Sequence, residues 1–429
     1  MGFLSGTSLI PRPDKGFYGW RMVVFASIAL ALTGPGQTVG ISVFVDPMIE
    51  DLGITRTQMS TAYLIGTLIG AIALPWIGQA LDRFGVRRVM ALVGFLFGAM
   101  LIAMSFITSI VGLTVGFIGI RMMGQGALSL TATTAIALWF TRKRGLAMGI
   151  VSAAGGVGMT MIPLAGERLI FELGWRNAWL IEGLVIWAVV VPIAVLAVRN
   201  RPSDLGQHVD GARVVPKNAP EVWGVTRKEA MRTSFFWLVT LAVTATGTLT
   251  TAVVFHQINL LGSRGLTATE AAANFIPQTI ATLIATLGIG ALADRISPRA
   301  VLITSMAMLA GGLLLGTQVS PGIVAIAFGM LIGGSGGAMR VVEATELPRY
   351  FGTLHIGAIR GVVTGATIAG SAVGPLLFAL GLGVTGDYSA ILVLSSLFPL
   401  SVIAATFFVR LPRHARPDSH GESHLVHEA

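Results

Sequence analysis

The stretch GQALDRFGVRR, residues 78–88, returns in outline as GALADRISPR, residues 290–299. A shift of 212 residues superimposes the two stretches: Gly78, Asp82, Arg83 and Arg87 fall on Gly290, Asp294, Arg295 and Arg299. Pairs of glycines arise by chance in a chain with 54 glycines, but a repeated Asp-Arg pair does not. An internal repeat of this length predicts two similar halves that follow one another along the chain.

Long apolar segments surround both stretches. Hydrophobic residues make up 54% of the chain and charged residues only 11%, whereas about a quarter of residues are charged in soluble proteins. A helix of about 20 apolar residues crosses the bilayer core. Twelve segments meet this requirement: residues 20–45, 58–79, 87–107, 112–138, 145–166, 177–198, 233–258, 270–292, 299–318, 322–347, 357–381 and 388–409. The sequence therefore predicts an all-α membrane protein with twelve transmembrane helices in two pseudo-symmetric six-helix halves.

The predicted halves are separated by a polar, proline-containing segment, which has the composition of a linker. The expected units are an N-terminal half at residues 1–198, a cytoplasmic linker at residues 199–232, and a C-terminal half with a short cytoplasmic tail at residues 233–429.

Lys and Arg are distributed unequally between the two sides of the membrane. With a cytoplasmic N-terminus, 24 of the 29 Lys and Arg residues lie inside, 4 lie outside, and Arg121 lies within a span. Cytoplasmic loops carry such an excess, so we expect a multi-pass inner-membrane protein with both termini in the cytoplasm. Contact with anionic lipid headgroups accounts for the net charge of +9 without a nucleic-acid partner.

Several classes of activity lack their motifs here. The chain contains no cysteine, which excludes disulfides and thiolate metal sites. We recognise no metal-ligand cluster, nucleophile constellation or nucleotide-binding loop in the sequence. We therefore expect neither enzymatic activity nor ATP-driven transport, and no cofactor or metal.

The stretches at 78–88 and 290–299 resemble the loop signature of the major facilitator superfamily, between helices two and three and between helices eight and nine. The resemblance implies the superfamily's fold and secondary transport. Three further stretches resemble its monocarboxylate porter and oxalate:formate antiporter group: YGWRMVV at 18–24, FVDPMIEDLGITRTQMS at 44–60, and ELPRYFGTLHIGAIRG at 346–361. Monocarboxylate porters usually carry an anion-binding Arg in helix eight, whereas residues 274–290 contain no charge.

Charged residues at cytoplasmic helix ends are expected to act in gating. An Asp can face the positive N-terminus of a neighbouring helix, and an Arg can pair with an acid while the inner side is closed. Such contacts break on opening and set the balance between two states. The predicted gating residues are Asp82, Arg83, Arg87, Asp294, Arg295, Arg299, Arg340 and Glu343. Topological anchoring is the alternative for the loop arginines, and snorkelling is the alternative for the i, i+3 pair Arg340 and Glu343.

Arg121 is the basic residue placed well inside a span, about 13 Å from the outer end of helix four at 1.5 Å per residue. A charge at that depth is a functional-site hypothesis by default. Arg121 also resembles the helix-four Arg of the superfamily's second signature. Two alternatives remain open: contact with an anionic substrate, or hydrogen bonds to carbonyl groups of helix one around Gly34, Pro35 and Gly36.

Polar side chains in apolar helices are further candidates for substrate binding or coupling: Gln37 and Thr38 in helix one, His256 and Gln257 in helix seven, and Gln278 and Thr282 in helix eight. Hydroxyl groups in helices often bond their own backbone instead, and His256 can be an interfacial residue without a coupling role. The interruption at Gly34-Pro35-Gly36 supports a site beside helix one, because broken helices border binding sites in many transporters.

Three functions are compatible with these features. The first is alternating-access transport of small organic anions such as monocarboxylates, as a symporter or antiporter coupled to protons or to another anion. The second is efflux of amphipathic or neutral compounds, favoured by the Thr-rich and apolar segments. The third is a non-transporting receptor or scaffold in the membrane.

Overall fold

The computed structural model describes residues 16–141, 143–211, 223–292, 296–352 and 354–409. These residues form helices joined by short turns, and the extended backbone among them pairs in an isolated bridge between Gly224 and Gly352. The all-α prediction is confirmed.

In the first half, several spans are divided into shorter helices. Its elements are α1 (Gly19–Ala31), η1 (Gly34–Gly36), α2 (Thr38–Ile41), η2 (Ser42–Phe44), α3 (Val45–Leu52), α4 (Arg56–Ile72), α5 (Leu74–Phe84), α6 (Val86–Met104), α7 (Ile110–Ile120), η3 (Arg121–Leu128), α8 (Ser129–Trp139), α9 (Arg144–Pro192) and η4 (Ile193–Ala197). The interruption predicted at Gly-Pro-Gly is present as η1, and the chain bends there by 45°.

The second half consists of longer, more continuous helices. After the short linker elements η5 (Pro202–Leu205), η6 (Val209–Gly211) and α10 (Arg227–Ala230), it contains α11 (Ser234–Gly262), α12 (Ala268–Ala273), α13 (Phe275–Leu292), α14 (Pro298–Gly316), α15 (Ile323–Phe351), α16 (Ile356–Thr385) and α17 (Tyr388–Phe408).

Helix α9 is a hairpin of two spans. With η4 it covers 54 residues, or about 80 Å of straight helix, more than twice the thickness of a bilayer core. Gly174 interrupts it with a φ of 80° and a ψ of 158°, a conformation that favours glycine. A Cβ atom on Gly166 would lie 3.5 Å from Oε1 of Glu182, so the chain eight residues before Gly174 lies against the chain eight residues after it.

This hairpin completes the span count. Among the described residues, ten helices are long and apolar enough to cross a membrane, and the bent pair at η1 makes eleven. Division of α9 at Gly174 makes twelve, in agreement with the sequence prediction. The chain is a multi-pass integral membrane protein.

The repeat seen in the sequence is also present in the packing. Thr55 and Thr267, 212 residues apart, each cap a helix by accepting a hydrogen bond from the backbone N–H three residues later. A Cβ atom on Gly158 would collide with Ala31 of α1, and one on its repeat partner Gly370 would collide with Thr248 of α11. Small residues therefore allow close helix contact at the same place in each half.

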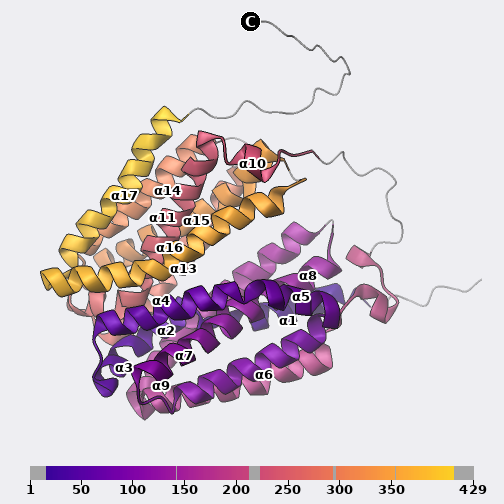
Figure 1. The fold of residues 1–429 in the computed structure, drawn as a ribbon, viewed down its shortest axis with the longest axis horizontal. Helices are drawn as coiled ribbons and strands as arrows, with labels where there is room; N and C mark the ends of the chain where they lie inside the picture. The colour runs from indigo at the N-terminus through magenta and orange to yellow at the C-terminus, as the bar shows by residue number, and fades with distance from the viewer. Residues whose placement is uncertain (1–15, 142, 212–222, 293–295, 353, 410–429) are drawn as a thin grey trace, which may run out of the picture.

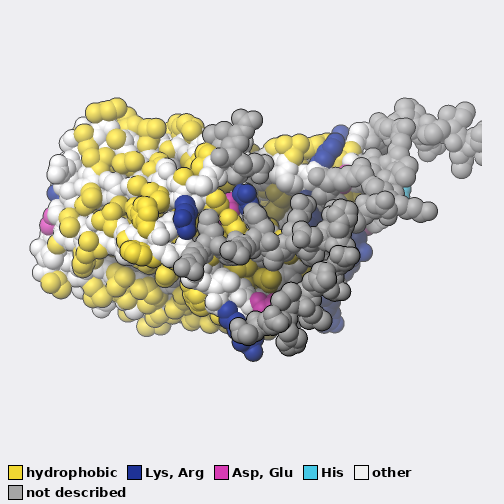
Figure 2. Space-filling model, turned by 90° about the horizontal axis from the view of Figure 1, so that it is seen from above, with side chains coloured by type: hydrophobic (Ala, Val, Ile, Leu, Met, Phe, Trp, Pro, Cys, Tyr) yellow, Lys and Arg dark blue, Asp and Glu magenta, His cyan; other side chains and the backbone are white. Residues whose placement is uncertain are grey.

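The two halves form separate bundles that meet at one end. Figure 1 shows them in contact on the side of α3 and diverging toward the side where α8 and α10 lie. Contacts between halves include a hydrogen bond from Thr269 to Glu167 and the rings of Tyr63 and Phe255, 4.6 Å apart. In Figure 2 the surface is largely hydrophobic, and the visible Lys and Arg side chains gather toward the diverging end.

Candidate functional site

A cavity of about 260 Å³ lies between the two halves. The first half contributes residues of α2 and α9 to its wall, and the second half contributes residues of α11, α13 and α15. Because no single half encloses it, the cavity must change shape whenever the halves move relative to one another.

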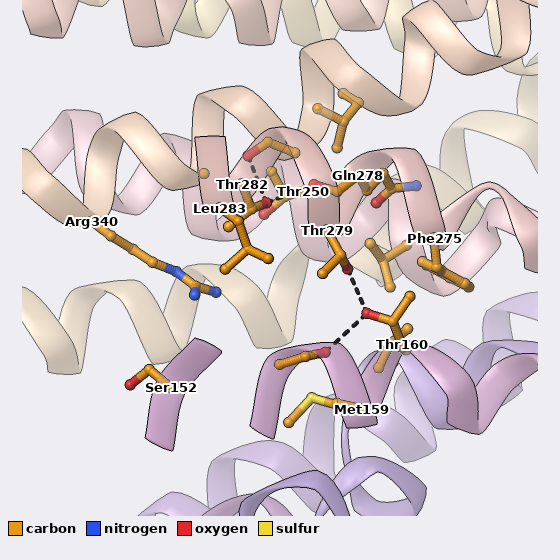
Figure 3. A pocket seen from close by; sticks show the side chains of 16 residues that line it. Ser152, Met159, Thr160, Thr250, Phe275, Gln278, Thr279, Thr282, Leu283 and Arg340 are labelled. Atoms are coloured by element: carbon orange, nitrogen blue, oxygen red, sulfur yellow. Dashed lines mark hydrogen bonds between the residues drawn. The ribbon is translucent and has the colours of Figure 1, made fainter. Parts of the chain in front are cut away.

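Two threonines join the halves at this cavity. Thr160 on α9 and Thr279 on α13 share a hydrogen bond of 2.5 Å between their hydroxyl oxygens (Figure 3). Behind them α13 and α15 pack closely, because a Cβ atom on Gly333 would overlap the carbonyl group of Gln278. This glycine thus allows Gln278 to sit beside α15 at the cavity wall.

Arg340 supplies a positive charge to the cavity. Its side chain leaves α15 and extends into the space between α13 and α9, on the side of Ser152 (Figure 3). The side chain is exposed, and among the described residues its guanidinium group forms no hydrogen bond or ion pair. Glu343, the expected i+3 partner, interacts with Arg340 electrostatically at longer range and accepts its hydrogen bond, of 3.4 Å, from Arg360 on α16. Arg340 is therefore placed in the cavity wall, with its donors available.

A chain of amides leads from the cavity wall into the second half. Gln278 lines the cavity and donates to Oε1 of Gln257 at 2.7 Å and to Oδ1 of Asn274 at 3.3 Å. Thr282, one turn further along α13, also lines the cavity, and its hydroxyl donates to the carbonyl of Gly333 at 2.8 Å. Of the predicted binding residues, the structure brings Gln278 and Thr282 into the cavity, with Gln257 directly behind them.

Arg121 lies in a separate cluster inside the first half. It begins the π-helical turn η3 and is 3% exposed. Its Nε donates to Oγ1 of Thr67 at 3.0 Å, and its Nη1 donates to the Gly36 carbonyl at 3.2 Å and to Oγ1 of Thr38 at 3.5 Å. The guanidinium carbon lies 4.6 Å from the ring centre of Tyr63, which adds a cation–π contact. These contacts place Arg121 and Thr38 together, and neither is among the residues that line the cavity, although Val39 next to Thr38 is.

The two remaining predicted binding residues are also outside the cavity wall. Gln37 donates to the hydroxyl of Thr33 at 3.3 Å, within helix one. His256 is buried in the second half, where Nε2 lies 2.8 Å from the carbonyl of Pro375 and the ring stacks on Phe378.

The predicted gating arginines bind within their own halves. Arg87, at the start of α6, donates to the carbonyl of Val195 at 3.0 Å through Nε, and Arg299, its repeat partner, donates to the carbonyl of Val409 at 2.7 Å. Both therefore bond carbonyl groups at the C-terminal end of the last span of their half, where a cation is favourable. Arg83 is exposed beside the ring of Phe84. Asp294 and Arg295, and the side chain of Asp82, lie outside the part of the chain that the structure describes.

Four hydroxyl residues of the cavity wall were missed by the sequence analysis: Ser152, Thr160, Thr250 and Thr279. Thr160 and Ser152 lie on α9 in a Gly- and Ala-rich stretch, and Thr279 follows Gln278 directly. The sequence feature that could have identified them is a hydroxyl residue among small residues. The same feature occurs at many positions that only face a neighbouring helix, so it does not single out a cavity.

Comparisons with known proteins agree with this architecture. The model of the Major Facilitator Superfamily matches residues 22–277, more than half of the chain. Monocarboxylate transporter 13 of Bos taurus is 27% identical over 91% of this chain and 89% of its own. A triacylglyceride transporter of Mycobacteroides abscessus is 34% identical over 40% of this chain, but the match spans only 32% of that protein.

A solved structure shares the fold over most of the chain. A bacterial homologue of the human lysosomal transporter Spinster, in an inward-facing and unoccupied conformation, superimposes with a TM-score of 0.69 and 16% identity. The superposition covers 92% of this chain and 97% of that one. The match of the family model over more than half of the chain, together with the two repeated halves and the cavity between them, shows that this chain belongs to the Major Facilitator Superfamily.

Proposed function

We propose that this protein is a secondary transporter of small organic anions, with monocarboxylates as the substrate class, that works by alternating access. The observation that carries the proposal is the guanidinium group of Arg340 in the cavity between the halves, which forms no hydrogen bond or ion pair with the described residues. Ionisable residues within spans mark substrate or ion pathways, and an Arg fork matches a carboxylate in geometry and charge. The name of the bovine relative, a monocarboxylate transporter, supports the same class.

The proposed carrier differs from monocarboxylate porters in the helix that supplies the cation. Helix eight of this chain, α12 with α13, has no basic residue within residues 274–290, whereas α15 places Arg340 at the same cavity. We also propose that transport of the anion is coupled to the movement of protons or of a second anion. Efflux of amphipathic or neutral compounds is the second candidate, favoured by the apolar lining residues and by the name of the mycobacterial relative.

Uptake by proteoliposomes tests the proposed function. We expect saturable uptake of a labelled monocarboxylate from a panel of formate, lactate and pentanoate, and faster uptake under an imposed pH gradient if protons are coupled. Empty liposomes are the control. Movement of a labelled triacylglycerol, together with no uptake of any anion in the panel, would contradict the proposal and support the efflux alternative.

The proposed orientation places the linker and both termini in the cytoplasm, so that the halves diverge toward the inside. The excess of Lys and Arg at that end supports this orientation. The natural chain has no cysteine, so single cysteines at Ser109 and Ser203 provide unique labels. We expect a membrane-impermeant thiol reagent to label the first from outside and the second only from inside. Labelling of both positions from one side would overturn the topology.

A further inference from the structure

The orientation of the Gln278 amide is set by two backbone carbonyl groups that lie behind it. Gln257 donates through Nε2 to the carbonyl of Ala271 at 2.9 Å, and Asn274 donates through Nδ2 to the carbonyl of Ala325 at 2.6 Å. A backbone carbonyl can only accept, so both amides must turn their nitrogen atoms toward these carbonyls. Their oxygen atoms are then turned toward Gln278, which must present its own nitrogen to both.

The result is an acceptor that faces the cavity. Nε2 of Gln278 uses both of its hydrogens, in the bonds of 2.7 Å and 3.3 Å to Gln257 and Asn274. Gln278 is only 7% exposed, and its Oε1 accepts no hydrogen bond from the described residues. In Figure 3 the amide nitrogen points away from Arg340, which leaves the oxygen on the cavity side.

The threonines near Gln278 also have no hydrogen left to donate. Thr160 donates to the carbonyl of Gly156 at 2.9 Å, so the hydroxyl of Thr279 must be the donor in the bond between the two. The hydroxyl of Thr282 is directed at the carbonyls of Gln278 and Gly333, both at 2.8 Å. Since a hydroxyl has one hydrogen, these side chains can only accept from a substrate.

The end of the cavity opposite Gln278 carries hydrogen-bond donors. Arg340 has five N–H donors and no acceptor, and the exposed Ser152 lines the same cavity with no hydrogen bond to the described residues. Gln278 sits beside Gly333, and Arg340 is seven residues further along α15, about 10 Å of helix rise. The Arg340 side chain extends back over part of that length, so a short acid can reach both ends.

We infer that the substrate carries a hydrogen-bond donor at the end opposite its carboxylate, as an ω-hydroxy or ω-amino carboxylate does. This inference rests on the proposed function, because it takes the carboxylate at Arg340 as given. A bare alkanoate would leave Oε1 of Gln278 without a partner, and a dicarboxylate would place acceptors against acceptors. A site built to bond one polar group discriminates strongly against an analogue that lacks it.

Three five-carbon acids of matched length test the inference: pentanoate, 5-hydroxypentanoate and glutarate. Their binding is measured by calorimetry on the full chain in nanodiscs. We expect 5-hydroxypentanoate to bind at least about tenfold more tightly than pentanoate, since it makes one additional hydrogen bond in a buried site. Glutarate is expected to bind more weakly than pentanoate.

The variant Gln278→Met removes the acceptor and keeps the length of the side chain. We expect it to bind pentanoate and 5-hydroxypentanoate within about threefold of one another. Thr246→Val is the control, because this buried hydroxyl bonds the carbonyl of Ala242 within α11 and does not line the cavity. It should keep the natural ligand order. If Gln278→Met does not fold, the order of the affinities of the natural chain for the three acids tests the inference by itself.

Failure of the donor requirement and failure of the proposed function give different results. Equal binding of pentanoate and 5-hydroxypentanoate by the natural chain, or tightest binding of glutarate, would overturn the donor requirement and leave anion transport standing. Binding of none of the three acids, with binding of the neutral 1,5-pentanediol, would overturn the proposed function together with this inference.

Discussion

Replacement of Arg340 by Gln should weaken binding of pentanoate by roughly 30- to 1,000-fold. The side chain is the cation in the cavity wall, and its fork of donors has no partner among the described residues that could take over a bound carboxylate. Loss of one partner of a hydrogen-bonded charge pair costs about 2–4 kcal/mol, which corresponds to that range of affinities. Calorimetric titration of the purified variant, with uptake into proteoliposomes in parallel, measures the effect.

Two further variants separate charge from geometry. Arg340→Lys keeps a point charge without the planar fork, so we expect an affinity between those of the natural chain and of Arg340→Gln. Arg168→Gln is the matched control, because Arg168 is 70% exposed and pairs with Glu172 on the surface of α9. Its affinity should equal that of the natural chain. An Arg340→Gln variant that binds pentanoate within threefold of the natural chain would remove Arg340 from the anion site and favour the efflux alternative.

The architecture of this protein could be read from its sequence because the signals for it are local. Each span is a continuous apolar segment, and the repeat at 78–88 and 290–299 reveals the division into halves without any contact information. The hairpin at Gly174 follows the same logic, since the apolar segments on either side of it are each one bilayer long.

The cavity could not be read in the same way. Arg340 was assigned to the cytoplasmic end from its position along helix ten, but that position does not reveal that α15 turns this face toward α9. Thr160 and Thr345 are both hydroxyl residues in apolar helices that donate to a carbonyl four residues earlier, yet only Thr160 also meets the opposite half. The difference arises from packing between the halves, which the period of a single helix does not encode.

At Arg121, in contrast to Arg340, we expect a loss of stability and little change in affinity. Replacement of Arg121 by Gln should lower the free energy of unfolding by about 2–4 kcal/mol, because it removes a buried side chain that joins three elements. Its bonds to Thr67 on α4 and to the Gly36 carbonyl in η1 hold the break in helix one against η3. The affinity for pentanoate should change by less than about threefold, since Arg121 does not line the cavity.

Chemical unfolding in detergent and calorimetric titration of the same preparation measure both quantities. Arg121→Lys should also be destabilised, because one ammonium group on a flexible stem cannot reproduce the planar fork that reaches both Thr67 and Gly36. Thr67→Val removes a single bond of the cluster and should cost about 1 kcal/mol. A stable Arg121→Gln variant with no affinity for pentanoate would instead make Arg121 a direct partner of the anion, in a state where η1 and η3 separate. The stability of Arg121→Gln therefore decides between the two roles that its depth in the membrane allows, because a substrate contact lowers affinity alone whereas a structural contact lowers stability first.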